Sequence, residues 1–226
     1  MLAELKYIPT AWNNVRGSKS FRNQLIFSLL LFVVAHLHNF YCLRMWQGRP
    51  GIQINDMVLN IMQPLDFSLP IFIVEYSAIL LGAAFVLVYP VQFVRGLQMF
   101  ALMMFARTFC IAVVALEPPV GMVPLWDPVA NLFLHTHETF VTKDLFFSGH
   151  IGALSIVMFI SLNKYVKAWV LTATIIVALL LMWQHVHYSS DVIFAPLASY
   201  VAYKIVNYVH RETQYGLQME PSQTNF

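Results

Sequence analysis

Two polar strings interrupt apolar stretches of this sequence and carry side chains suited to chemistry. Residues 145–150 read LFFSGH, and residues 185–191 read HVHYSSD. Ionisable groups are costly to place in an apolar span, where they usually face a cavity or a partner. The two strings are therefore the first candidates for a functional site.

His187 and Asp191 are four positions apart, so on a helix they would share one face and touch. A carboxylate beside an imidazole fixes its tautomer and raises its basicity, which a nucleophilic histidine needs. His150 follows Ser148 and Gly149 at the start of an apolar stretch, where the free amides of a first helical turn favour an anion. A histidine beside a bound phosphate can protonate a leaving alkoxide and then activate an acceptor.

Arg107 is a cation inside another apolar stretch. Its planar guanidinium suits bidentate binding of phosphate, and the alternative is a structural ion pair with Glu75. Because a buried charge without a function is costly, the phosphate role is favoured. His185 is two positions from His187 and would point elsewhere on a helix, which indicates an accessory role near the substrate or in a lid.

Each feature also has a purely structural explanation. SGH alone is a weak signal, and the contact of His187 with Asp191 could be no more than a structural hydrogen bond. Their expected placement at the same membrane face as Arg107 favours one shared site. The other histidines are interpreted as interfacial or loop groups, of which the third and fourth could reach the site from their loop: His36, His38, His135, His137 and His210.

The composition is that of a polytopic membrane protein. Of the 226 residues, 59% are apolar and 11% are charged, against roughly 25% charged in a soluble domain. Runs of about 20 apolar residues predict membrane-spanning helices rather than barrel strands. Six spans are expected, at residues 21–43, 68–89, 91–116, 145–162, 166–184 and 192–209. The expected class is therefore all-α, with one membrane domain at 21–210 between an amino-terminal segment, 1–20, and a polar tail, 211–226.

The distribution of basic residues predicts the orientation of the spans. Of the thirteen lysines and arginines, nine fall on one side: Lys6, Arg16, Lys19, Arg22, Arg95, Lys164, Lys167, Lys204 and Arg211. The positive-inside bias then makes both termini cytoplasmic and the polar strings extracytoplasmic. The long segments 44–67 and 117–144 lie on that second side and could roof a site, and a short interfacial helix is expected near 55–62. A net charge of +2 without a basic block beyond the amino-terminal cluster argues against a nucleic-acid partner.

The polar strings resemble a known family. LFFSGH and HVHYSSDVIFA are similar to the paired histidine motifs of sphingomyelin synthases and their relatives, a branch of the type 2 phosphatidic acid phosphatase superfamily. RTFCIAVVALEPPVG, at 107–121, is similar to that branch's arginine-bearing stretch. The resemblance covers roughly the latter half of the chain. It implies a type 2 phosphatidic acid phosphatase-like bundle of six helices, with a triad of His150, His187 and Asp191 that works through a phosphohistidine.

The chain departs from the family pattern at three positions. Thr142 and Lys143 stand where the family has cysteine and glycine before a retained Asp144, and Glu117 stands where it has proline. These departures concern the surroundings of the triad rather than the triad.

The expected function is a membrane enzyme that moves a phosphorylated headgroup from a phospholipid donor to a ceramide- or diacylglycerol-like alcohol. His187 attacks phosphorus, Asp191 orients it, and His150 protonates the leaving group. Five residues are expected to contact the substrate: Arg107, Ser148, Gly149, Asp144 and His185. No metal or other cofactor is required, because arginine, helix amides and imidazolium offset the phosphate charge. Two alternatives stay open, hydrolysis by a lipid phosphate phosphatase and a non-enzymatic protein that binds haem or a metal; the oligomeric state is not predicted.

Overall fold

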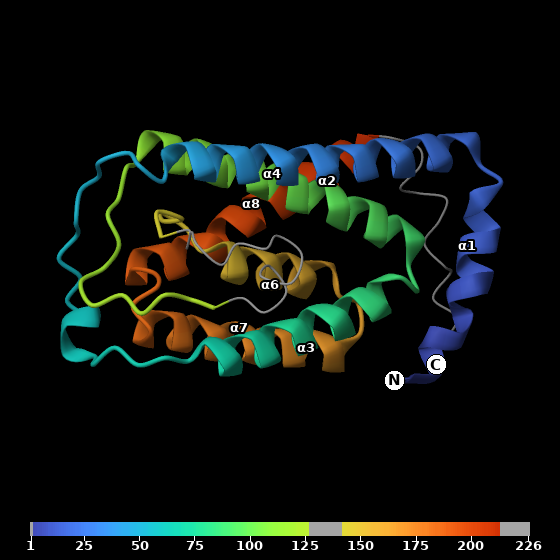
Figure 1. The fold of residues 1–226 in the computed structure, drawn as a ribbon. Coiled ribbons are helices and arrows are strands. Elements are labelled where there is room, and N and C mark those ends of the chain that lie inside the picture. Colours follow the sequence, from blue (N-terminus) through green and yellow to red (C-terminus); the bar gives the residue numbers. More distant parts are fainter. Residues whose placement is uncertain (1, 127–141, 213–226) are drawn as a thin grey trace.

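The computed structural model describes residues 2–126 and 142–212, which form a helical bundle (Figure 1). Five of the described helices are long and apolar enough to cross a membrane: α2 (Lys19–Trp46), α3 (Ser68–Val86), α4 (Pro90–Val113), α7 (Lys164–Trp183) and α8 (Ser189–Glu212). The predicted all-α class is confirmed, and the five helices correspond to five of the expected spans.

The remaining expected span, 145–162, is helical over a shorter stretch. Its helix, α6 (Gly149–Ile160), has 12 residues, which is about 18 Å at 1.5 Å per residue. A hydrocarbon core is about 30 Å thick. The helix begins late because Ser148 caps its first turn with extended backbone, and its side chain accepts the N–H of Ile151.

The centre of the bundle is occupied by α6, which packs against α3, α4, α7 and α8. Small residues allow these close approaches. A Cβ added at Gly82 of α3 would lie 2.1 Å from Val157 Cγ1, and one at Gly152 would lie 3.1 Å from Met103 Sδ. Since seven residues of α6 are buried, the first turn of this helix opens into the interior of the bundle.

One end of the bundle, which we call the loop end, carries the segments 47–67 and 114–126 and the turn 184–188 (left in Figure 1). Backbone hydrogen bonds join the two segments, from Ile52 N to Ala115 O at 2.9 Å and from Glu117 N to Ile52 O at 3.0 Å. The predicted helix near 55–62 is only the single 3₁₀ turn η2 (Leu59–Ile61).

The opposite end carries the amino-terminal segment, which folds onto the bundle as η1 (Leu2–Tyr7) and α1 (Ile8–Arg16). Trp12 of α1 donates its indole N–H to Leu87 O at 2.8 Å, just beyond the end of α3. The helix α1 therefore lies across this end of the bundle (right in Figure 1). Most of the predicted polar tail, 211–226, lies outside the described residues.

Candidate active site

The turn between α7 and α8 brings His187 against Asp191. His187 Nδ1 is 3.3 Å from Asp191 Oδ2, and both side chains are buried. The sequence predicted this contact from a shared helical face, but His187 lies in a bend before α8 and only Asp191 is in the helix. The contact forms because the Asp191 carboxylate also accepts the N–H of Tyr188, at 3.2 Å, and so closes the first turn. With Nδ1 occupied, Nε2 is the histidine nitrogen left for chemistry.

Two loop contacts hold this turn in place. The Tyr188 hydroxyl donates to Glu117 O at 2.9 Å and accepts from Ile54 N at 3.2 Å. Asp56 accepts the N–H of Ser189 at 2.7 Å. Burial would raise the pKa of Asp56, but the backbone amides that it binds, that of Ser189 foremost, hold the pKa below its usual value. The loop end therefore fixes the start of α8 with a carboxylate that stays ionised.

Arg107 of α4 is buried and anchored by three groups. Its Nε donates to Phe147 O at 3.1 Å and its Nη1 to Asn39 Oδ1 at 3.2 Å, while its Nη2 pairs with Asp144. The alternative partner weighed from the sequence, Glu75, is therefore not the one that the structure gives it. Gly149 packs flat on the guanidinium, because a Cβ there would lie 3.2 Å from Arg107 Cζ. The cation thus lies against the first turn of α6.

Asp144 serves Arg107 rather than a phosphate. Burial would raise the pKa of Asp144, but the charge of Arg107 and its hydrogen bond hold the pKa below its usual value. An ionised carboxylate repels a phosphate, so the predicted contact of Asp144 with substrate stays a prediction that its charge opposes. Its place beside the guanidinium makes it an orienting partner instead.

His150, in the first turn of α6, lies near His187 and Glu75. Its ring centroid is 6.2 Å from that of His187, and its Nε2 is 4.0 Å from Glu75 Oε2. The side chain is 24% exposed, so the ring can be reached from outside the protein. Ser148, predicted to contact substrate, is buried and uses its hydroxyl as the helix cap. The structure therefore brings the predicted triad and Arg107 together around the start of α6.

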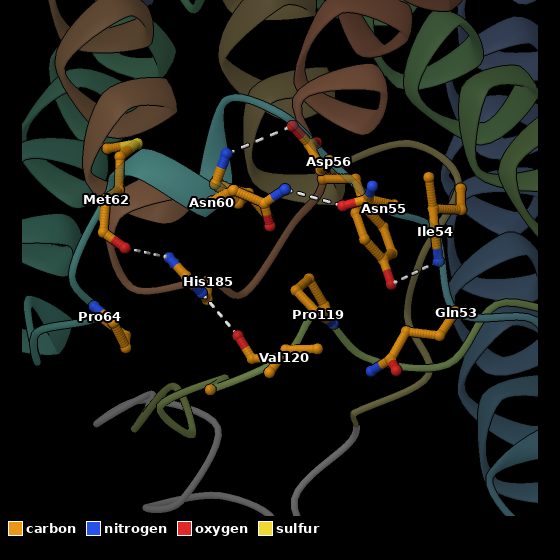
Figure 2. Close-up of a pocket in the computed structure, with 13 residues that line it drawn as sticks. Gln53, Ile54, Asn55, Asp56, Asn60, Met62, Pro64, Pro119, Val120 and His185 are labelled. Atoms are coloured by element: carbon orange, nitrogen blue, oxygen red, sulfur yellow. Dashed lines mark hydrogen bonds between the residues drawn. The ribbon is translucent and has the colours of Figure 1, made fainter.

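His185 lies apart from this cluster. Its backbone is left-handed, at φ 57°, and this turns the ring toward the loop end. There Nδ1 is 2.7 Å from Val120 O and Nε2 is 3.2 Å from Met62 O (Figure 2). The ring lines a pocket of about 530 Å³ between the two loop segments. The accessory role predicted for His185 is thus, in structural terms, a link between loops.

Two further residues that hold the site in place were not predicted from the sequence. Asn39 of α2 accepts a hydrogen bond from Arg107. The sequence feature that could have pointed to it is a polar amide inside an apolar stretch. Gln184 is buried at the end of α7, where its side chain accepts from Phe67 N at 2.9 Å and donates to Ser68 Oγ at 3.0 Å. That amide fixes the start of α3, the helix that carries Glu75.

Lys143 and Glu117 form an ion pair between two segments. Lys143 Nζ lies 2.7 Å from Glu117 Oε1, and the same oxygen accepts from Gly51 N at 2.8 Å. The hydrogen bond from Lys143 lowers the pKa of Glu117. The pair ties the segment before α6 to the loop end.

No protein-family model matches the chain, and no curated protein matches it. Within residues 2–126 and 142–212, no three histidine, cysteine, aspartate or glutamate side chains are grouped as metal ligands would be. His135 and His137, which were interpreted as loop groups that could reach the site, lie outside those ranges. The cluster around α6 is therefore the feature of this structure that points to a function.

Proposed function

We propose that this chain is an integral membrane enzyme that transfers the phosphorylated headgroup of a phospholipid through a phosphohistidine on His187. The observation that carries the proposal is the fixed pair of His187 and Asp191, 3.3 Å apart, with the ring of His150 6.2 Å from that of His187. Two histidines around one phosphorus can divide the roles of nucleophile and acid. The resemblance of LFFSGH and HVHYSSDVIFA to the sphingomyelin synthase branch supports the same assignment.

The reaction would run in two balanced halves. In the first, the Nε2 lone pair of His187 attacks phosphorus, the bond from phosphorus to the donor alkoxide breaks, and the His150 imidazolium gives that alkoxide its proton. In the second, neutral His150 takes the proton of an acceptor hydroxyl, whose oxygen attacks phosphorus. The P–N bond then breaks, which restores neutral His187 and protonated His150.

The cluster offers several groups to offset the phosphate charge. A guanidinium has five N–H groups, and three protein acceptors bind Arg107 through one nitrogen each. Donor capacity therefore remains for phosphate oxygens. The amino terminus of α6 adds the partial positive charge of a helix start. Such preorganised donors are worth about 10² to 10³ in rate each.

The finer architecture belongs to this proposal as well. Five long helices with α6 at their centre support a six-helix bundle of the type 2 phosphatidic acid phosphatase kind, with α6 as its shortened fourth helix. The basic-residue distribution supports cytoplasmic termini and a site that faces the extracytoplasmic side. The acceptor that we favour is a lipid alcohol of the ceramide or diacylglycerol type, and water is the alternative.

Product analysis tests the proposal. Purified protein is incubated with phospholipids labelled in the headgroup phosphate, with and without ceramide or diacylglycerol. A new labelled phospholipid is the expected product, while free labelled headgroup would indicate hydrolysis by the same site. His187→Ala should abolish either product, and His38→Ala, which removes an exposed histidine of α2, is the matched control. Turnover by His187→Ala at the wild-type rate would overturn the proposal.

A further inference from the structure

The corner between α1 and α2 carries three cations that the proposed reaction does not use: Arg16, Lys19 and Arg22. Ser18 has extended backbone and caps α2, so α2 leaves α1 at a sharp angle (upper right in Figure 1). All three cations are exposed. We call these three residues the corner cluster.

Apolar packing holds the corner to the rest of the bundle. Val15 of α1 and Phe21 of α2 are buried together with Val94 of α4. The ring of Trp12 also packs edge-on against Phe21, at a centroid distance of 6.0 Å. These contacts fix the place where α1 ends and α2 begins, so the corner cluster has a defined position.

Arg22 is itself tied to the corner. Its Nη1 donates to Arg16 O at 3.2 Å and to Gly17 O at 3.4 Å, which are carbonyls at the end of α1. A guanidinium has five N–H groups, and these two bonds use Nη1 alone. Donors on Nε and Nη2 therefore remain for a ligand.

The positive charge of the corner cluster is not paired within the described parts of the chain. The sequence has no aspartate or glutamate between Glu4 and Asp56, and Glu4 accepts a hydrogen bond from Asn163 Nδ2 at 2.8 Å. No ion pair among residues 2–126 and 142–212 includes a residue of the cluster. The cluster is therefore a concentrated, uncompensated positive patch.

The exposed apolar surface of α2 begins one turn beyond the cluster. Ile26 and Phe27 are 57% and 59% exposed, and Ile26 is four residues from Arg22, which is about 6 Å along a helix. Further exposed apolar side chains continue along α2: Leu29, Leu30, Val33, Val34 and Leu37. When such a surface lies among acyl chains, long basic side chains at the helix end reach the level of the phospholipid headgroups.

We propose that the corner cluster binds the phosphate of an anionic phospholipid whose acyl chains lie along the exposed apolar face of α2. Arginine and lysine donate charge-assisted hydrogen bonds to phosphate oxygens. Each basic residue near an anionic membrane surface strengthens binding about fivefold. A zwitterionic headgroup gains less, because its ammonium group offsets the charge of its phosphate. This lipid lies at the opposite end of the bundle from His187 and is not a substrate of the candidate active site.

Quenching of a probe beside the cluster tests this binding. A fluorophore is attached to Ser20→Cys, at an exposed position of α2, in the full-length protein without Cys42 and Cys110. The protein is reconstituted into phosphatidylcholine vesicles with increasing fractions of a lipid that carries a nitroxide near its headgroup, either phosphatidylglycerol or phosphatidylcholine. Half-maximal quenching should need at least about fivefold less of the labelled phosphatidylglycerol, and salt should reduce this preference.

Neutralisation separates the cluster from the general charge of this end of the bundle. Arg16→Gln with Lys19→Gln removes two charges and keeps the bonds of Arg22 to the end of α1, so the preference for phosphatidylglycerol should fall at least about fivefold. The matched control is Lys164→Gln with Lys167→Gln, two exposed cations of α7 at the same end, and it should keep the wild-type preference. If the first double variant does not fold, Lys19→Gln alone takes its place and should show a smaller loss.

Three results would overturn the proposed lipid site. Equal quenching by the two lipids in the wild type would show that the corner does not select an anionic headgroup. A corner variant that keeps the preference would exclude the cluster as its cause. An equal loss in both double variants would assign the preference to the overall charge of this end. None of these results bears on the proposed function, which product analysis tests separately.

Discussion

At the scale of single residues, Arg107 shows how the site organises charge. Its guanidinium joins α4 to α2 through Asn39 and to the segment before α6 through Phe147 and Asp144. These partners lie 37 to 68 residues away in sequence. A cation held from three directions cannot follow a substrate, so it presents its remaining donors in one fixed direction.

Replacement of this cation tests its proposed role in phosphate binding. Arg107→Lys keeps the charge and loses the planar fork, so phosphohistidine formation should fall about 10² to 10³-fold. Asn39→Ala serves as the comparison, because it removes one anchor and leaves the guanidinium, and it should cost less than about tenfold. The check is the single-turnover labelling rate of each variant, measured beside its thermal unfolding. A fully active Arg107→Lys protein would exclude bidentate phosphate binding.

At the scale of elements, the close packing of α6 on its neighbours sets the position of His150. Gly82 of α3 lies so close to Val157 of α6 that an added Cβ would meet Cγ1 at 2.1 Å. Because Gly82 has no side chain, α3 and α6 can approach each other closely at this point. This approach also brings Glu75 of α3 near His150 of α6.

Overpacking at this contact should separate the two helices. Gly82→Ala is expected to lower the free energy of unfolding by about 1 to 3 kcal/mol. Val157→Ala added to it removes the Cγ1 atom that clashes and should restore much of that loss. Denaturant or thermal unfolding in detergent measures both variants. If the double variant is less stable than Gly82→Ala, the close contact is not the cause.

His185 joins the two segments of the loop end. Its ring spans the carbonyls of Val120 and Met62, one from each loop segment. Truncation by His185→Ala should leave these two segments less firmly joined, and proteolysis near residues 52–64 and 117–123 should accelerate severalfold. Asn60→Ala, at an exposed residue of the same pocket whose amide donates to Asn55 Oδ1 within one loop segment, is the control and should digest as wild type. Unchanged digestion of His185→Ala would show that the ring does not join the loops.

The sequence predicted the elements better than their contacts. Long apolar stretches predict membrane-spanning helices, so the sequence anticipated five of the helices: α2, α3, α4, α7 and α8. The pairing of His187 with Asp191 was also anticipated, although from a helical face that does not exist there. The partners of Arg107 and the nearness of Glu75 to His150 were not anticipated, because which faces of α3, α4 and α6 meet depends on packing between distant segments.

At the scale of the whole molecule, the distribution of basic residues predicts which end of the bundle faces the cytoplasm. The loop end carries the candidate site, and the opposite end carries α1. Cysteines at Pro124 and Ser222, in a background without Cys42 and Cys110, should react with a membrane-impermeant reagent from opposite sides. Reaction of both from the same side would reject the predicted orientation of the chain.

The most direct test of the central claim is to trap the covalent intermediate. His150→Ala removes the group that we propose protonates the leaving group and activates the acceptor, so label should enter slowly and remain on His187. Asp191→Asn should retain weak labelling, because the nucleophile is present but poorly oriented. Each variant is mixed with a phosphate-labelled phospholipid and the reaction is quenched rapidly. The measurement is the acid-labile phosphate that stays on the protein. Retained label is expected in His150→Ala and none in His187→Ala, whereas equal label in His187→Ala would contradict the phosphohistidine mechanism.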